Sequence, residues 1–508
     1  MSFDLSIPGQ LGMALLPEIV LTAGAMLLLL AAAWGKETPT RARTIGALGI
    51  VLTFVTIGLV AWMWMSGAKA TPGIIAVDGF RWGADMVILL ATIIAIALGI
   101  DYARVEQLVS GETYVLVLLA SAGMMLLTSA RDLIIVFLGI ELMSIAVYVL
   151  AGVNRRSAKS AEASLKYFLL GAFSTGFLLY GIALIYGATG STDLATIGSK
   201  VTGATIAAAP MLLAGVALLL VGFGFKVAAV PFHMWTPDVY EGAPTPITAY
   251  MAAAVKAAAF AALFRVWREA FPGALASWHL GLWWLAVLTM VVGNLIALVQ
   301  KNIKRMLAYS SIAHAGYLLV AVASNNQLGS AAFLFYVLAY TLATMGAFGV
   351  VIAVGEPGER HQQLSDFAGL WTVRPWLAAA MAVFMLALLG FPIAGGMGFF
   401  AKWYVLQAAL DAAHPETALA VVLVLTSVLS AGYYLAVVMA MFMRPRSADA
   451  PALRPVRAPT FLVVYASAIV LLFFGIFPAG FLGLARYSVP TMAAAAPASS
   501  PPTAIARR

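Results

Sequence analysis

Four charged residues lie within apolar stretches long enough to cross a membrane: Glu141, Lys226, Lys256 and Lys402. An ion at the centre of a bilayer costs at least ~2.5–3.5 kcal/mol, so such residues usually face a protein interior and serve transport. A carboxylate near a lysine changes the proton affinity of both groups. One glutamate and three lysines inside a helix bundle therefore indicate a relay for protons.

Each of these residues also has a structural interpretation. Glu141 could be a neutral, hydrogen-bonded carboxyl group, although we favour a functional acid paired with a lysine. Lys226 and Lys402 could extend to the membrane interface along their stems. Lys256 lies ten residues into its stretch among alanines, where such an extension is difficult.

Two histidines are weaker candidates, because a lone histidine is often only a satisfied core residue. His314 lies in the middle of an apolar stretch between two lysine regions, where it could bridge a chain of water molecules. His233 lies close to Pro231. We expect Arg265, Arg268 and Glu269, at the end of a stretch, to form a solvated face.

Composition places the chain in a membrane. Of its 508 residues, 63% are hydrophobic and only 10% are charged, whereas soluble domains have roughly 25%. The net charge of +8 gives no indication of nucleic-acid binding, because the basic residues lie in short loops between apolar stretches. The chain has no cysteine, so thiolate-held iron–sulfur clusters and cysteine zinc sites are excluded. No histidine spacing indicates a metal, and no nucleotide-binding loop is present.

A helix needs about 20 apolar residues to cross a bilayer, which predicts an all-α polytopic membrane protein with about fourteen spans. Basic residues concentrate in alternate loops, which places both termini outside the cytoplasm. The expected spans are 13–34, 44–65, 84–101, 113–129, 132–153, 163–187, 209–230, 247–268, 279–300, 303–323, 329–354, 375–411, 417–443 and 460–484.

Two spans should break. Pro231 interrupts the seventh, and Pro392 with Gly395 and Gly396 interrupts the twelfth. Breaks five spans apart, each beside a lysine, indicate an inverted repeat. The predicted divisions are residues 1–112 (helices 1–3), 113–268 and 279–443 (the two five-helix repeats), 444–492 (helix 14) and 493–508 (a disordered tail).

Two long motifs identify a family. Residues 230–260 read VPFHMWTPDVYEGAPTPITAYMAAAVKAAAF, and residues 299–317 read VQKNIKRMLAYSSIAHAGY. Both closely resemble the antiporter-like membrane subunits of respiratory complex I, the NADH:quinone oxidoreductase, and the resemblance covers essentially the whole chain. Among the related subunits, the lysine in GFFAKWYVL (Lys402) is typical of one branch. A second branch has glutamate there, and a third adds a long lateral helix for which this chain leaves no room.

The resemblance implies roles for the matching residues. Glu141 and Lys226 match the glutamate and lysine that pair on helices 5 and 7. Lys256 matches a linking lysine on helix 8, His314 a connecting residue, and Lys402 the lysine near the outward half-channel.

The expected function is proton translocation by a subunit of NADH:quinone oxidoreductase in the bacterial inner membrane, with both termini periplasmic. The resemblance implies no cofactor in this chain. NADH, FMN, iron–sulfur clusters and quinone would belong to partner subunits, and other membrane subunits, the hydrophilic arm and lipids would be the partners. One alternative is a subunit of a multisubunit cation/proton antiporter. Another is a purely structural subunit, against which four costly intramembrane charges argue.

Overall fold

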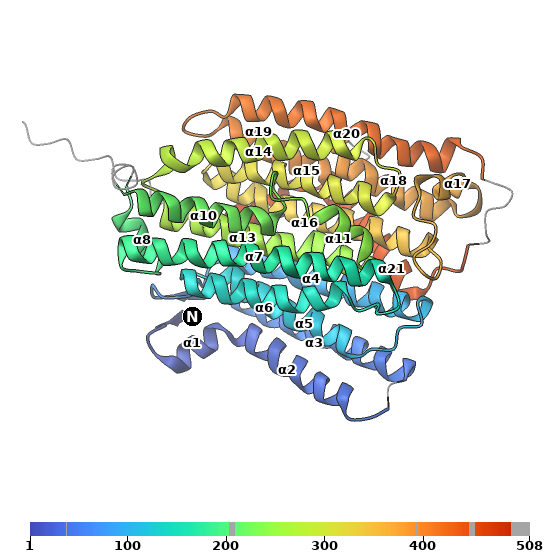
Figure 1. Cartoon of the computed structure of the whole chain (residues 1–508), viewed down its shortest axis with the longest axis horizontal. Helices are drawn as coiled ribbons and strands as arrows, with labels where there is room; N and C mark the ends of the chain where they lie inside the picture. Colours follow the sequence, from blue (N-terminus) through green and yellow to red (C-terminus); the bar gives the residue numbers. More distant parts are fainter. Residues whose placement is uncertain (37, 203–208, 393–394, 447–452, 489–508) are drawn as a thin grey trace, which may run out of the picture.

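A computed structural model of the chain describes residues 1–36, 38–202, 209–392, 395–446 and 453–488. Its helices lie roughly parallel, with α2 (Leu16–Ala33) along one edge of the bundle and α20 (Thr417–Met443) along the opposite edge (Figure 1). Thirteen described helical segments are long and apolar enough to cross a membrane. A further crossing is divided between α18 (Pro375–Leu389) and α19 (Met397–Leu410). The predicted all-α membrane fold is therefore confirmed.

The N-terminal part contains the short α1 (Pro8–Ala14) and three crossings, α2, α3 (Pro39–Met65) and α4 (Gly79–Val105). Asp78 caps α4 by accepting a hydrogen bond from the backbone amide of Arg81 (2.8 Å). The helix therefore begins before the expected boundary at residue 84. Two two-residue strands, β1 (Ser2–Phe3) and β2 (Lys69–Ala70), pair in parallel and were not predicted, because strands this short carry no hydrophobic alternation.

The first five-helix repeat packs against these crossings. Its helices are α5 (Glu112–Ser129), α6 (Leu133–Ala151), α7 (Ala158–Thr189), α8 (Leu194–Lys200), α10 (Pro210–Val227), α11 (Thr236–Gly242), α12 (Thr245–Tyr250), the π-helix η1 (Met251–Val255) and α13 (Lys256–Ala270). Segments α12, η1 and α13 form one continuous crossing. The chain leaves α10 at Val227 and passes through turns to α11, which confirms the break in the seventh span.

The second repeat follows and also contains a broken crossing. Its helices are α14 (Leu275–Ala297), α15 (Ile303–Ala323), α16 (Gln327–Val354), the 3-10 helix η2 (Leu364–Phe367), α17 (Leu370–Val373), α18, α19 and α20. The break in the twelfth span lies between Leu389 and Met397, as predicted. The last span is interrupted at Phe477, between α21 (Ala458–Ile476) and α22 (Pro478–Ser488), instead of running unbroken to residue 484. The predicted disordered tail lies outside the described residues.

The interior of the bundle is formed by the α12–η1–α13 crossing, α15 and α16. Every side chain from Thr245 to Val266 is buried, and α16 packs against α4, α18, α19 and α21. The edge helices instead expose large apolar side chains such as Leu27 and Phe54. A charge on α13 or α15 is therefore surrounded by protein, whereas a charge on an outer face would meet lipid.

Candidate functional site: a buried lysine and histidine axis

Lys226 lies in the last turn of α10, beside the first helix break. Ala228, the next residue but one, adopts a left-handed conformation (φ 60°) that ends the helix. The Lys226 residue is 4% exposed. Its ammonium group donates hydrogen bonds to the hydroxyls of Ser144 (2.8 Å) and Tyr148 (3.1 Å) on α6. This lysine is held in the interior and does not extend to the interface.

Glu141 lies on the same face of α6, three residues before Ser144 and seven before Tyr148. Glu141 is half-buried, whereas the sequence analysis expected it to be fully buried. Within the described part of the chain, Glu141 forms no ion pair with Lys226, whose described partners are the two hydroxyls. The structure thus brings the glutamate and the lysine to one face of α6 and places neutral groups next to the ammonium.

Lys256 begins α13, directly after the π-helical turn η1. It is 2% exposed and donates hydrogen bonds to both the carbonyl and the hydroxyl oxygens of Ser311 on α15. The Tyr340 ring lies 5.9 Å from the ammonium. Because α13 belongs to the first repeat and α15 to the second, Lys256 connects the two repeats at the centre of the bundle.

His314 lies one helical turn after Ser311 on α15. The ring is buried, and its Nδ1 and Nε2 atoms lie 2.6 Å and 3.1 Å from the hydroxyls of Tyr336 and Tyr434. The Tyr434 hydroxyl also shares a hydrogen bond with Ser310. His314 is therefore the centre of a buried hydroxyl network that begins one turn from the Lys256 contact.

Lys402 lies on α19, after the second break, and is 7% exposed. Its ammonium donates a hydrogen bond to the carbonyl oxygen of Leu389 (2.9 Å), one of the acceptors freed where α18 ends. The ammonium also lies 4.6 Å from the centre of the Tyr317 ring. Gly390 ends α18 with a positive φ of 77°, and a Cβ there would lie 2.8 Å from the Lys402 Cδ.

The remaining predicted residues surround the breaks. Pro231 and Pro392 are exposed, and His233 is half-buried with a buried Nδ1 that has no hydrogen-bond partner among the described residues. Gly395 and Gly396 are buried. A Cβ on Gly395 would lie 2.3 Å from the Phe391 carbonyl oxygen, so the backbone of the second break is too close for a larger residue.

The three lysines share one property. Their described hydrogen-bond acceptors are hydroxyl and carbonyl oxygens, and no described carboxylate lies within ion-pair distance of any of them. A lysine with neutral partners can release its proton without leaving an unpaired carboxylate behind. The arrangement is suited to proton transfer, since each lysine has a fixed polar neighbour.

Two charged clusters at the ends of the helices were missed by the sequence analysis. In one, Arg81 is fully buried and pairs with Glu18 (2.5 Å) on α2 and with Asp85 (3.5 Å) one turn further along α4. The expected start of this span at residue 84 placed Arg81 in a loop. An arginine and an aspartate four residues apart at the start of an apolar stretch were the available signal.

Arg265 belongs to a third cluster, next to that of Arg81. We expected Arg265 to lie on a solvated face, and the structure shows that this was wrong. It is 5% exposed instead of solvated, and its guanidinium pairs with Asp78 (2.8 Å) and with Glu269 (3.1 Å). Glu269 also pairs with Arg131 (2.7 Å). Arg265 is therefore buried beneath its ion-pair partners, whereas Asp78, Glu269 and Arg131 remain partly exposed.

The second of the two missed clusters lies where the loop after α16 meets the first repeat. Lys304, fully buried, pairs with Glu359 (2.7 Å), which also accepts hydrogen bonds from the amide (2.8 Å) and hydroxyl (2.7 Å) of Thr245 and from the Tyr102 hydroxyl (2.9 Å). Burial raises the pKa of Glu359, but the ion pair with Lys304 and these hydrogen bonds outweigh it and hold the pKa below its ordinary value. Glu359 is therefore a fixed negative charge.

Among the described residues, no group of three or more histidine, aspartate or glutamate side chains is arranged to hold a metal ion. The polar groups described in the interior include amines, hydroxyls, the amide of Asn294 and the imidazole of His314. Amines and an imidazole can bind and release protons.

The class of protein follows from a family model. Residues 130–430, more than half of the chain, match the family described as "NADH:quinone oxidoreductase/Mrp antiporter, TM". The chain belongs to this family. The matched segment contains Glu141, both helix breaks and all three lysines.

Individual relatives identify the branch. The chain is 55% identical to NADH-quinone oxidoreductase subunit N of Gemmatimonas aurantiaca, over 97% of this chain and 96% of the relative. It is 47% identical to subunit N of Trichlorobacter lovleyi, over 94% and 96%. The resemblance to the branch with a lysine in GFFAKWYVL, which is subunit N, is thus confirmed.

Solved structures agree. A chain of respiratory complex I from Thermus thermophilus with bound aureothin is 38% identical, with a TM-score of 0.78 over 92% of this chain and 99% of that one. A chain of the Mrp complex from Dietzia is 23% identical, with a TM-score of 0.79 over 93% and 97%. The second likeness shows a shared fold only.

Proposed function

We propose that this chain is a proton-translocating membrane subunit of NADH:quinone oxidoreductase. The observation that carries the proposal is the series of three buried lysines, each hydrogen-bonded to neutral oxygens, beside or between two broken helices. The names of the closely similar relatives support the enzyme complex, and the buried lysines support the role within it. The electron-transfer chemistry would take place in partner subunits.

In this proposal, Lys226, Lys256 and Lys402 exchange the translocated protons. Glu141 adjusts Lys226 through the shared face of α6. His314 connects Lys256 to Lys402, because its ring contacts both Tyr340, which lies beside Lys256, and Tyr317, which lies beside Lys402. Pro231, Pro392, Gly395 and Gly396 keep the two helices open beside the lysines, where backbone groups and water can take part. His233 contributes a polar group at the first break.

The proposed partners are other membrane subunits of the complex and, indirectly, its hydrophilic NADH-oxidising arm. NADH, FMN, iron–sulfur clusters and quinone would be bound by those partners, which fits a chain without cysteine. The two repeats, residues 113–268 and 279–443, would act as two half-channels linked by the contact between Lys256 and Ser311.

We place the chain in the bacterial inner membrane with both termini in the periplasm, on the basis of the loop charges. A protease-cleavable tag fused after Arg508 should be removed from the outer side of spheroplasts. Cleavage confined to inside-out vesicles would reverse the orientation.

The direct test measures NADH-driven proton translocation in membrane vesicles. Lys226→Ala and Glu141→Ala should each depress translocation while the complex stays assembled. Glu141→Gln should be milder if the glutamate adjusts Lys226, and as severe if it carries a proton. Lys301→Ala, which removes an exposed lysine in the loop between α14 and α15, is the matched control. Wild-type translocation and quinone reduction in both alanine variants would contradict the relay.

The alternative of a cation/proton antiporter subunit shares the fold. It predicts that cells without this chain lose sodium tolerance but keep NADH oxidation. Co-purification of NADH-oxidising subunits with the chain would favour the enzyme complex.

A further inference from the structure

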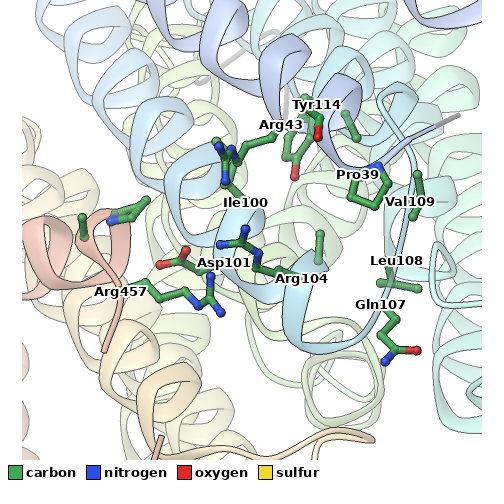
Figure 2. Close-up of a pocket in the computed structure, with 15 residues that line it drawn as sticks. Pro39, Arg43, Ile100, Asp101, Arg104, Gln107, Leu108, Val109, Tyr114 and Arg457 are labelled. Atoms are coloured by element: carbon green, nitrogen blue, oxygen red, sulfur yellow. The ribbon is translucent and has the colours of Figure 1, made fainter. Parts of the chain in front are cut away.

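Two adjoining cavities lie where the ends of three membrane-crossing helices meet. Their volumes are about 620 and 310 Å³, and both are lined by Asp101 and Arg104 near the end of α4 and by Arg457 just before α21. Figure 2 shows Arg43 of α3, Arg104 and Arg457 gathered around Asp101. We call this double space the arginine cavity. Its size is within the range of about 300–1,000 Å³ typical of small-molecule sites.

The arginine cavity carries an excess of positive charge. Arg43, Arg104 and Arg457 line the larger part, and Arg454 joins them in the smaller part. All four are exposed, and among the described residues their guanidinium groups form no ion pair, in contrast to Arg81, Arg131, Arg265 and Arg305. The cavity therefore presents several cations that form no ion pair with a described carboxylate.

Asp101 is the one acidic residue among the described lining residues, and it has another partner. Its Oδ2 atom accepts hydrogen bonds from the amide (3.0 Å) and the hydroxyl (2.7 Å) of Thr460 in the first turn of α21. These bonds tie α21 to α4 and fix the walls of the cavity. The carboxylate is thus used to position the site, and it offsets only one of the positive charges.

Helix ends reinforce the charge. Pro39 and Thr40 at the start of α3 and Ala458 and Pro459 at the start of α21 line the cavity. The N-terminus of a helix carries a partial positive charge that favours anions such as phosphate. Because proline has no N–H, the backbone donors among these four residues are those of Thr40 and Ala458. The cavity also includes the C-terminal end of α4, whose partial negative charge is offset by Arg104 in its last turn.

The position of the cavity defines the kind of anion. α3, α4 and α21 are all membrane crossings, so their ends lie at the level of lipid headgroups. Leu48 on α3 and Phe461 and Leu462 on α21 are exposed apolar residues on two of the helices that line the cavity. We propose that the arginine cavity binds the phosphate headgroup of an anionic phospholipid, whose acyl chains lie along α3 and α21. Basic pockets between membrane helices are suited to such headgroups.

Binding can be measured on the purified full-length chain in detergent by native mass spectrometry, which resolves single lipid adducts. The probes are phosphatidylglycerol, phosphatidylcholine and inorganic phosphate. We expect phosphatidylglycerol to bind in preference to phosphatidylcholine and inorganic phosphate not to displace it. The double variant R104Q/R457Q should bind phosphatidylglycerol at least about tenfold more weakly.

Two matched variants complete the test. R155Q/R156Q removes two exposed arginines that do not line the cavity and should leave binding unchanged, whereas R104K/R457K keeps the charge and should retain most of it. If R104Q/R457Q does not fold, the single variant R43Q provides the same comparison.

Unchanged binding of phosphatidylglycerol in the glutamine variants would overturn the proposal. Equal binding of phosphatidylcholine would overturn the selectivity for anionic lipid, and displacement by inorganic phosphate would show a site for free anions instead.

Discussion

Buried cations occur in two regions of this molecule and are held in opposite ways. At the ends of the bundle, Arg265 lies 2.8 Å from Asp78, and Lys304 lies 2.7 Å from Glu359. At the centre, Lys226, Lys256 and Lys402 contact only hydroxyl and carbonyl oxygens among their described hydrogen-bond partners.

The difference separates structural charges from exchangeable ones. A buried cation paired with a carboxylate stays charged, and the loss of either partner leaves an uncompensated ion. A lysine among neutral oxygens has no such partner, so its proton can leave at a lower cost. The comparison predicts that substitutions at the ends reduce stability, whereas substitutions at the centre reduce proton transfer.

The largest effect should follow from breaking a paired charge. Burial raises the pKa of Asp78, but the ion pair with Arg265 outweighs it and holds the pKa below its usual value. Arg265→Met leaves Asp78 as an unpaired charge and should lower the free energy of unfolding by ~3–5 kcal/mol. Thermal unfolding of the purified chain and the amount of assembled complex measure this. Adding Asp78→Asn should recover part of the loss, and no recovery would contradict the pairing.

Glu359→Gln tests the other paired region through pH. A carboxylate whose pKa is lowered on folding contributes stability above its ordinary value of 4.5, and this contribution is lost as the pH falls through the lowered pKa. The variant should be less stable than wild type at neutral pH by ~1.5–3 kcal/mol. The difference should shrink on acidification below 4.5. Parallel unfolding curves down to pH 3 would exclude an ion pair between Lys304 and Glu359.

A substitution at the centre should spare stability. Lys256→Arg keeps the positive charge but cannot release a proton at ordinary pH, so it should depress proton translocation as strongly as Lys256→Met. We expect at least about a tenfold reduction, because a positioned acid–base group typically contributes roughly 10²–10⁴-fold. Assembly, measured on native gels, should match that of the control Lys301→Arg. Full translocation in the arginine variant would mean that a fixed charge is sufficient.

The smallest effect should separate two substitutions at one position. Lys402→Glu should be tolerated better than Lys402→Ala, because a related branch carries glutamate there and an acid can also exchange protons. The expected difference in translocation is a few-fold, on the order of 1 kcal/mol or less. Equal rates in the two variants would show that position 402 needs no titratable group.

Much of the fold was predictable, because lipid imposes long apolar segments and proline interrupts them. The break between Leu389 and Met397 and the break after Val227 follow from Pro392 and Pro231 in this way. The burial of Lys256 followed from its distance to both ends of the segment. Lys226 and Lys402 were also recognised, since a charge within such a segment is conspicuous.

The partners of these residues were not predictable, because they depend on contacts between distant segments. Lys304 and Glu359 lie 55 positions apart, and Arg265 and Asp78 lie 187 apart. Ser311 and Tyr434 are unremarkable residues in an apolar helix until packing places them beside Lys256 and His314. The half-burial of Glu141 likewise depends on which helices cover α6.

Gly390 links the shape of the backbone to the choice of residue at 402. Its positive φ of 77° favours glycine, and the Lys402 stem occupies the space that any side chain would need. A side chain at 390 would therefore meet both the lysine stem and the strain of the left-handed turn. A shorter residue at 402 would remove only the first obstacle. Glycine should therefore persist at 390 even in chains that carry another residue at 402.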